Sequence, residues 1–311
     1  MGILAVREGG DVAAVTSPPS ERQSRLARRG RMIGLAAVLP AFLVVVGFMI
    51  YPVLFALYIS FNDSNGLRFD WVGLANYLDI LADPQVHQIF ITNLKFLISV
   101  PLVIFAALVV SILLFERIRG WRAFRVLFFL PNVLSAAVIG IMFKSVFGYN
   151  GPFMAALEAL GGERIDPFVD GNLAIAVIVL ALVWSGFGYQ SLLLLSGLTA
   201  IDPAVFEAAA LDGAGWWTRL WHITLPNIRR VLGFVFIINV LYTFSSLFGF
   251  VFVMTAGGPG FETTTLDYLV YLRAFSTSNL GSGAALAVLL FMFIGLLTLV
   301  QARFFKLSED D

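Results

Sequence analysis

The sequence contains no cysteine, and only 13% of its 311 residues are charged. The absence of cysteine excludes disulfides, thiolate metal ligands and thiol nucleophiles. The two histidines, His87 and His222, lie far apart in the sequence, so no histidine metal site is expected. The formal net charge is zero, which gives no indication of a nucleic-acid partner. No G-x-x-x-x-G-K-[ST] loop occurs, so the chain does not hold ATP by that route.

Apolar residues are abundant: 59% of the chain is hydrophobic and the mean hydropathy is +0.90. Six apolar runs are long enough to cross a hydrocarbon core of about 30 Å, which takes about 20 helical residues. Lipid cannot satisfy open backbone groups, so these runs are expected to be helices. The predicted fold class is therefore an all-α integral membrane protein, a bundle of six transmembrane helices. The predicted spans are 33–60, 89–115, 125–147, 172–195, 231–254 and 283–304.

The first 31 residues are polar and carry an arginine cluster, and we expect a disordered cytoplasmic tail over 1–31. The following apolar run is too long for a signal-peptide core, so it is predicted to remain as the first span of a membrane domain over 32–311. With the N-terminus inside, 15 of the 20 lysines and arginines fall on the inner side, in the tail, the inner connections and the C-terminal end. The positive-inside rule then places both termini in the cytoplasm. The outer connections 62–88, 148–171 and 255–282 are acidic and are predicted to be irregular.

The longest inner connection, 196–230, contains signals for two short helices. Asp202-Pro203 is typical of a helix start, and Gly213 of a helix end. A second helical segment is predicted over 216–223, broken by Leu225-Pro226. Residue chemistry leaves two interpretations open. The pair either lies on the lipid surface with its tryptophans at headgroup depth, or inserts its alanine-rich helix into a groove on a partner protein.

Three elements of this connection, Glu207-Ala208-Ala209, Asp212-Gly213-Ala214 and Ile223-Thr224-Leu225-Pro226, resemble the EAA loop of permease subunits. Those subunits belong to bacterial binding-protein-dependent ATP-binding cassette (ABC) importers, and the likeness is to the carbohydrate-uptake group. Weaker similarities occur at 71–77, 255–259 and 301–303.

The resemblance implies the type I ABC importer permease fold and a place in the bacterial cytoplasmic membrane. It also implies a second, homologous permease subunit, two ATPase subunits and an extracytoplasmic solute-binding protein. ATP and Mg would bind the ATPase subunits, while this chain would bind no cofactor or metal and would not itself be an enzyme. The residues that it assigns to ATPase coupling are Glu207, Ala208, Ala209, Asp212, Gly213, Leu225 and Pro226.

Polar side chains inside the fourth and fifth predicted spans are candidates for the solute pathway. Neutral amides, hydroxyls and aromatic rings suit a sugar or another neutral polyol, although polar groups in spans also serve as bonds between helices. Lys95 and Lys144, in the second and third spans, either extend to the interface or meet an anionic substrate. The pathway candidates are Trp184, Tyr189, Gln190, Asn239, Tyr242, Thr243 and Ser246. The last four are predicted to share one helical face, at i, i+3, i+4 and i+7.

The sequence therefore favours a permease subunit that moves a sugar or sugar-like solute into the cytoplasm by alternating access. An importer of glycerophosphodiester-type substrates is one alternative. An ion-coupled secondary transporter is another, but the only acids near spans lie at their ends. An integral-membrane enzyme would need clustered acid, base or nucleophile groups at one membrane surface, and no such motif occurs.

Overall fold

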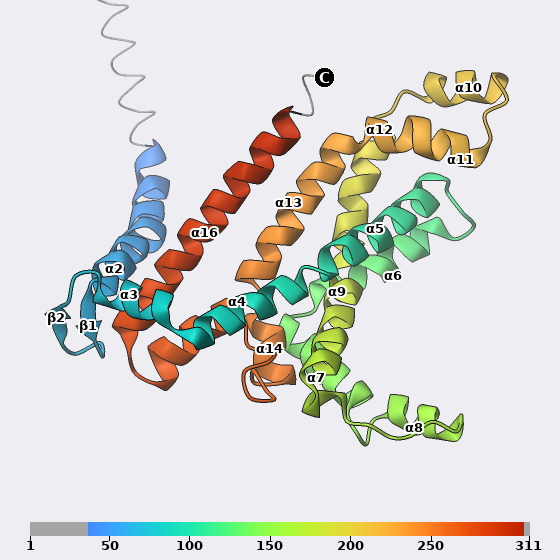
Figure 1. Ribbon diagram of the computed structural model, residues 1–311. Coiled ribbons are helices and arrows are strands. Elements are labelled where there is room, and N and C mark those ends of the chain that lie inside the picture. Colours follow the sequence, from blue (N-terminus) through green and yellow to red (C-terminus); the bar gives the residue numbers. More distant parts are fainter. Residues whose placement is uncertain (1–36, 308–311) are drawn as a thin grey trace, which may run out of the picture. The chain divides into compact units, whose positions relative to one another are not determined.

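The computed structural model describes residues 37–307 of the chain (Figure 1). The predicted tail 1–31 lies outside the described residues. The chain divides into two units, Met1–Phe55 and Ala56–Asp311. The described part of the first unit is helical, within a continuous helix over Ala37–Ser60 that includes the π turn η1 (Val46–Ile50) and α2 (Tyr51–Ser60).

The second unit is formed largely by helices that follow one another with short connections. Its helices are α3 (Ala75–Ala82), α4 (Pro84–Phe96), α5 (Ser99–Phe115), α6 (Trp121–Val133), α7 (Ala136–Phe147), α8 (Pro152–Ala159), η2 (Pro167–Val169), α9 (Gly171–Thr199), α10 (Pro203–Leu211), α11 (Trp216–Arg219), η3 (Leu220–Thr224), α12 (Leu225–Asn227), α13 (Arg229–Ser245), α14 (Phe248–Met254), α15 (Leu266–Tyr271), η4 (Leu272–Ser276) and α16 (Leu280–Leu307). Strands β1 (Asn62–Ser64) and β2 (Phe69–Trp71) pair antiparallel as a short hairpin.

The described helices confirm an all-α membrane protein. Four of them are long and apolar enough to cross a membrane, and the number rises to six when each of two bent pairs is taken as one span. The four are Ala37–Ser60, Pro84–Phe115, Gly171–Thr199 and Leu280–Phe304. They match the first, second, fourth and sixth predicted spans, with some ends displaced by several residues.

The third predicted span, 125–147, is not one continuous helix. It is broken between α6 and α7, and the pair Trp121–Val133 and Ala136–Ala159 is bent by 98°. Pro131 lies inside α6, where it removes one backbone hydrogen bond. Leu134 is extended, and Ser135 caps α7 by accepting from the Val138 amide. A serine cap after a proline therefore ends one helix and starts the next.

The fifth predicted span, 231–254, is also broken. α13 ends at Ser245, and α14 begins at Phe248 after the non-helical residues Ser246 and Leu247. The run carries Ser245 and Ser246 at this point, but its hydropathy stays high enough for a single span to be predicted. A second bend, of 68°, separates Trp216–Asn227 from Arg229–Ser245.

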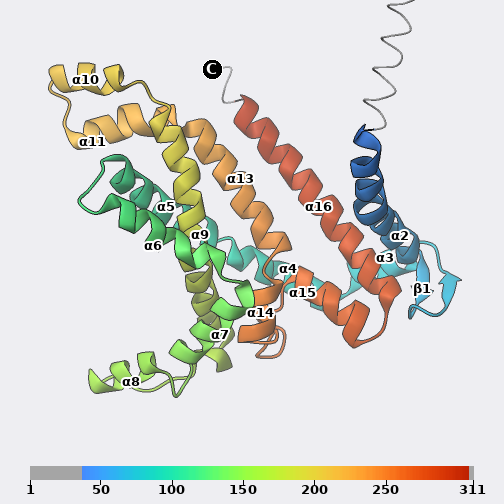
Figure 2. The same ribbon diagram turned by 180° about the vertical axis from the view of Figure 1, so that it is seen from behind.

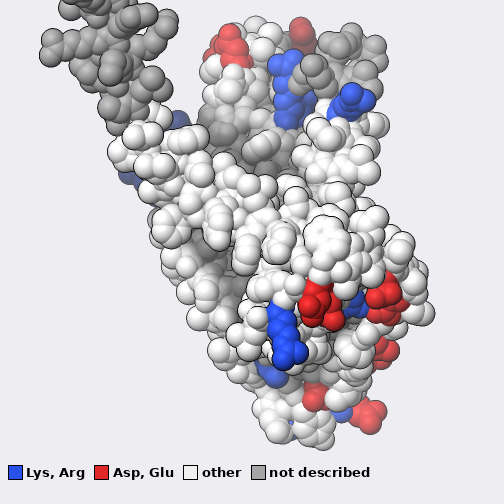
Figure 3. All heavy atoms as spheres, turned by 90° about the vertical axis from the view of Figure 1, so that its left-hand side faces the viewer, with Lys and Arg blue, Asp and Glu red and all other residues white. Residues whose placement is uncertain are grey.

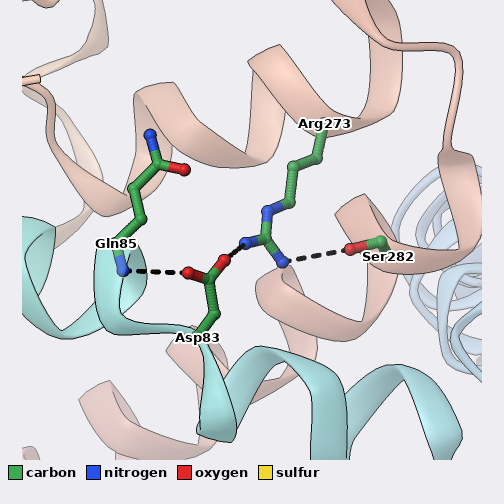
Figure 4. Close-up of polar contacts among 4 residues, drawn as sticks. All are labelled: Asp83, Gln85, Arg273 and Ser282. Carbon is green, nitrogen blue, oxygen red and sulfur yellow. Dashed lines mark hydrogen bonds and ion pairs between the residues drawn. The ribbon is translucent and has the colours of Figure 1, made fainter. Parts of the chain in front are cut away.

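The outer connections, predicted to be irregular, each contain short helices between their irregular segments. α3 and the β hairpin occupy the first, α8 the second, and α15 with η4 the third. Asp83 caps α4 through the Gln85 amide and forms an ion pair with Arg273 of η4. Arg273 also donates to Ser282 Oγ in α16 at 3.1 Å, so one guanidinium joins the two connections to the last helix (Figure 4). These polar contacts add to a buried apolar cluster that includes Tyr77, Ile80, Leu266 and Leu269 of the same two connections.

The core of the second unit forms where α9 packs along α5, and α6, α7 and α13 also contact α9. Gly188 permits the approach of α6, because a Cβ there would lie 1.9 Å from the Phe128 carbonyl oxygen. Small residues allow this kind of close helix packing in membranes. α13 also lies beside α16, as seen from behind in Figure 2. Figure 3 shows that most side chains on the displayed face carry no charge.

Candidate functional site

A cavity of about 300 Å³ lies among α5, α6, α7, α9, α13 and α14. Five of the seven predicted pathway residues line it: Tyr189, Gln190, Asn239, Tyr242 and Thr243. The other polar side chains of the lining are Ser99, Asn132 and Ser185, so every polar group facing the cavity from the described residues is a neutral amide, hydroxyl or phenol. The lining thus offers hydrogen bonds and ring faces, and carries no charge.

Several lining groups are held by hydrogen bonds within their own helices. Asn239 Nδ2 donates to the Val235 carbonyl at 2.8 Å, and Thr243 Oγ1 donates to the Asn239 carbonyl at 3.0 Å. Their remaining hydrogen-bonding capacity is available to a solute. Oε1 of the buried Gln190 has no hydrogen-bond partner among the described residues. An unsatisfied buried acceptor is costly, which favours a bound hydroxyl or water beside it.

Two predicted pathway residues do not line the cavity. Trp184 packs against the hydrophobic core instead, with its ring centroid 5.7 Å from that of Phe143. Ser246 lies beyond the end of α13, so it does not continue the helical face that Asn239, Tyr242 and Thr243 share.

Three polar lining residues were missed by the sequence prediction: Ser99, Asn132 and Ser185. Ser99 and Ser185 donate to carbonyls three residues earlier and resemble ordinary serines of membrane helices. Asn132 had a usable signal, because it follows Pro131 inside an apolar run, where an amide is costly unless it faces a partner or a wet cavity.

The lysines of the second and third spans lie away from this cavity. Lys95 Nζ donates to Asn172 Oδ1 at 3.2 Å, and Lys144 Nζ donates to the Val253 carbonyl at 3.3 Å. Both side chains are therefore engaged with neighbouring helices. Among the described residues, no group of three or more histidines, aspartates or glutamates gathers into a metal site.

The first helix of the long inner connection is α10, and its ends match the sequence signals. Asp202 accepts from the Ala204 amide at 2.9 Å, and Pro203 occupies the first turn. At the other end Gly213 has φ +77°, and the Ala214 amide donates to the Ala209 carbonyl at 2.9 Å. These bonds form a Schellman cap, so α10 is a rigid unit of defined length.

One side of α10 is packed and the other is open. Phe206 points toward the end of α5, with its ring centroid 5.8 Å from that of Phe115, and Ala209 is buried. Glu207 and Ala208 are exposed, and Leu211 is 90% exposed. The predicted coupling residues therefore divide: Ala209 is buried against the protein, whereas Glu207 and Ala208 are exposed.

The second helix of the connection is longer than predicted. It runs without interruption from Trp216 to Asn227 through η3, so Leu225-Pro226 does not break it. The wider π turn ahead of Pro226, in which the Leu225 amide bonds the Leu220 carbonyl, accommodates the proline inside the helix. The helix ends at Asn227, and Ile228 is the single non-helical residue before α13 starts at Arg229. The predicted connection 196–230 also shortens, because α9 extends to Thr199.

A second cavity, of about 560 Å³, lies between α10, α11 and the adjacent ends of α5 and α9. Glu207 contributes to its lining together with Glu116, Arg117 and Arg219. Trp216 Nε1 donates to Glu116 Oε1 at 2.5 Å and closes one side of this cavity. α10 and α11 lie side by side beyond the end of α9 in both ribbon views (Figures 1 and 2).

Comparison with known proteins gives close relatives over nearly the whole chain. The sn-glycerol-3-phosphate transport system permease protein UgpA of Brucella abortus biovar 1 (strain 9-941) is 34% identical over 268 residues, which cover 85% of this chain and 92% of that protein. The multiple sugar-binding transport system permease protein MsmF of Streptococcus mutans serotype c is 33% identical over 277 residues, with 88% and 94% covered. No protein-family model matches the chain.

Among solved structures, a bacterial ABC transporter involved in the import of the acidic polysaccharide alginate has a chain of the same fold. Its TM-score is 0.79 at 17% identity, covering 92% of this chain and 99% of that one. A second structure shows a bacterial alginate ABC transporter in complex with an alginate pentasaccharide-bound periplasmic protein, with a TM-score of 0.76 at 18% identity. At these identities the likeness supports the fold alone.

A polar cavity inside a helical membrane bundle, with an exposed helix at the end of the bundle, suits a transport permease, and the relatives identify the class. The chain belongs to the ABC importer permeases, the family of the sugar and sn-glycerol-3-phosphate transport system permeases. It is the membrane-spanning, multi-pass subunit of an importer. Membership of this family argues against an ion-coupled secondary transporter and against an integral-membrane enzyme.

Proposed function

We propose that this chain moves a neutral sugar or sugar-like polyol into the cytoplasm through the cavity among α5, α6, α7, α9, α13 and α14. The observation that carries the proposal is the uncharged polar lining of that cavity. Its volume of about 300 Å³ lies at the lower end of the range of about 300–1,000 Å³ typical of ligand pockets. Tyr189 and Tyr242 offer ring faces, while Gln190 and Asn239 offer amide hydrogen bonds to hydroxyls.

The driving force would come from partner chains. In this proposal two ATPase subunits bind ATP and Mg, and the exposed side of α10 docks in a groove on one of them. Support comes from α10 being capped at both ends and from the exposed side chains of Glu207, Ala208 and Leu211 along it. Movement of the loop, including Leu225 and Pro226, would switch the bundle between inward-open and outward-open states.

The remaining components follow from the family. The chain would pair with a second, homologous permease and receive solute from an extracytoplasmic binding protein. The arginine-rich inner connections support a place in the bacterial cytoplasmic membrane with both termini in the cytoplasm.

An anionic solute such as sn-glycerol 3-phosphate or a glycerophosphodiester is the second candidate. The relative with 34% identity, a permease named for sn-glycerol 3-phosphate, favours it. The neutral cavity disfavours it, because a phosphate out of water needs a cation or several donors nearby.

The test is uptake by the complete importer reconstituted in proteoliposomes, with labelled disaccharides and labelled sn-glycerol 3-phosphate offered separately. We expect uptake of a neutral sugar, and a loss of at least tenfold in Asn239→Leu and Gln190→Leu. Ser111→Ala is the control, because Ser111 is buried in α5 away from the cavity and bonds only within its helix. Uptake of the phosphate ester alone would replace this proposal by the second candidate.

A further inference from the structure

The break between α13 and α14 is held open by side chains from other parts of the fold. In an uninterrupted α-helix the amides of Leu247 and Phe248 would donate to the carbonyls of Thr243 and Phe244. Here Asn93 Nδ2 donates to the Thr243 carbonyl at 3.1 Å, and the Phe248 amide donates to Asp267 Oδ2 at 2.7 Å. One side chain thus replaces the missing donor, and another the missing acceptor.

Asn93 is completely buried, Asp267 is partly buried, and both have further partners. Asp267 also accepts a hydrogen bond from the Leu247 amide. Burial raises the pKa of Asp267 above its ordinary value, and its hydrogen bonds act in the opposite direction. Removing such polar groups from water is costly, which argues against a purely packing role.

The same two side chains are joined to the start of α15 in the last outer connection. Asn93 Oδ1 accepts from the Leu266 amide at 2.7 Å. Asp267 Oδ1 accepts from Thr265 Oγ1 at 2.5 Å and from the Tyr268 amide at 2.9 Å. The first turn of α15 is therefore hydrogen-bonded to both sides of the break. Asn93 links it to the end of α13, and Asp267 links it to the start of α14.

The break also borders the cavity. Tyr242 and Thr243, just before it, line the cavity, and so does Phe250 just after it. The angle between α13 and α14 sets the position of Tyr242 and Thr243 relative to Phe250. A change in the position of α15 would therefore be transmitted to two parts of the cavity wall.

We propose that Asn93 and Asp267 are positioning residues that fix the α13–α14 break and connect the outer segment α15 to the wall of the solute cavity. The inference rests on the proposed function, in which solute passes through that cavity. Neither residue needs to touch the solute. Sequence alone did not indicate them, because Asn93 lies in an apolar run and Asp267 in a connection predicted to be irregular.

The test measures the geometry of the break and transport separately. The chain has no cysteine, so Ser245→Cys with Phe252→Cys gives one spin-label pair across the break when cysteine-free partner subunits complete the importer. The distance distribution is measured by pulsed electron paramagnetic resonance with and without Asp267→Asn or Asn93→Leu. Asp267→Asn keeps the shape but replaces one acceptor oxygen by a donor.

We expect either substitution to shift or broaden the distance distribution and to lower the uptake rate per assembled complex at least tenfold. Asp170→Asn is the matched control, since Asp170 caps α9 through the Leu173 amide far from the break in sequence, and it should change neither readout. If Asp267→Asn does not assemble, Thr265→Val removes one of its partners, keeps the carboxylate, and should give a smaller change in the same direction.

An unchanged distance distribution in assembled Asp267→Asn and Asn93→Leu complexes would overturn the inference, as would an altered distribution with uptake at the wild-type rate. A merely structural role would reduce the amount of complex and leave both values per complex unchanged. Failure of the wild type to take up a neutral sugar would refute the proposed function instead, and the distance measurement would still decide the role of the two residues.

Discussion

The indole Nε1 of Trp216 donates a hydrogen bond to Oε1 of Glu116 at 2.5 Å and joins the start of α11 to the end of α5. Phe206 of α10 contacts Phe115 beside it, with ring centroids 5.8 Å apart. The inner loop is thereby attached to α5, whose other end contributes Ser99 to the cavity. A movement of α10 should therefore be passed to the cavity through α5 as well as through α9.

Trp216→Phe removes the hydrogen-bond donor and keeps most of the ring. A hydrogen bond of this kind contributes about 0.5–1.5 kcal/mol, so we expect the solute moved per ATP hydrolysed to fall a few-fold. Glu116→Gln retains an acceptor oxygen and should stay near the wild type. Trp221→Phe, at an exposed indole of η3, is the control. Equal coupling ratios for Trp216→Phe and Trp221→Phe would argue against a mechanical role of this bond.

Gly188 is the closest point between α9 and α6. A Cβ there would lie 1.9 Å from the Phe128 carbonyl oxygen, so Gly188→Ala must separate the helices. Overpacking of this type costs about 1–3 kcal/mol, and we expect a lower midpoint in thermal unfolding of the purified complex. Gly295→Ala in α16 has no atom within 4 Å of the added Cβ and should be neutral or slightly stabilising. A similar midpoint for both variants would show that the contact at Gly188 is looser than described.

The ion pair between Asp83 and Arg273 is mostly buried and should couple the first and last outer connections. A double-mutant cycle with Asp83→Asn and Arg273→Gln should give a coupling energy of about 1 kcal/mol or more in unfolding. The exposed pair of Glu158 and Arg164 is the internal reference, for which a value of about 0–0.5 kcal/mol is expected. Equal coupling energies for the two pairs would contradict the role given to Arg273.

α10 is capped at both ends, by Asp202 at its start and by the turn at Gly213 after its end. Gly213→Ala meets no atom within 4 Å, so its cost comes from the positive φ alone, about 1–2 kcal/mol. We expect lower uptake with normal membrane insertion, and Gly215→Ala, at an extended residue with open space, should be silent. Hydrogen exchange of the α10 amides measures the loosening directly. Unchanged exchange in Gly213→Ala would show that the Schellman cap does not hold the helix end.

Much of the fold was predictable because the relevant physics is local or depends on long apolar runs. Four spans follow from hydropathy, and α10 follows from Asp202-Pro203 and Gly213, whose roles are set by neighbouring backbone groups. The break at Ser246 and Leu247 was not predictable, because its stabilising partner Asn93 lies 150 residues from Thr243 in the sequence. The π turn before Pro226 was also missed. A proline in the sequence does not show whether the helix ends before it or continues through a wider turn.

The candidate cavity was predicted in part. Asn239, Tyr242 and Thr243 share a helical face, and that periodicity was sufficient to group them. Periodicity placed Ser246 on the same face, which the end of α13 prevents. Trp184 was chosen for its ring, but a tryptophan in a span packs against a core as readily as it lines a cavity.

Docking of the exposed side of α10 on an ATPase subunit is the claim on which the mechanism depends. A photo-crosslinking amino acid at Leu211, the last residue of α10, which is 90% exposed, tests it in the assembled importer. Leu160, which is 87% exposed after α8, is the matched control on an outer connection. We predict an adduct with the ATPase subunit from position 211 and none from position 160. No ATPase adduct from position 211, or equal adducts from both positions, would contradict the account.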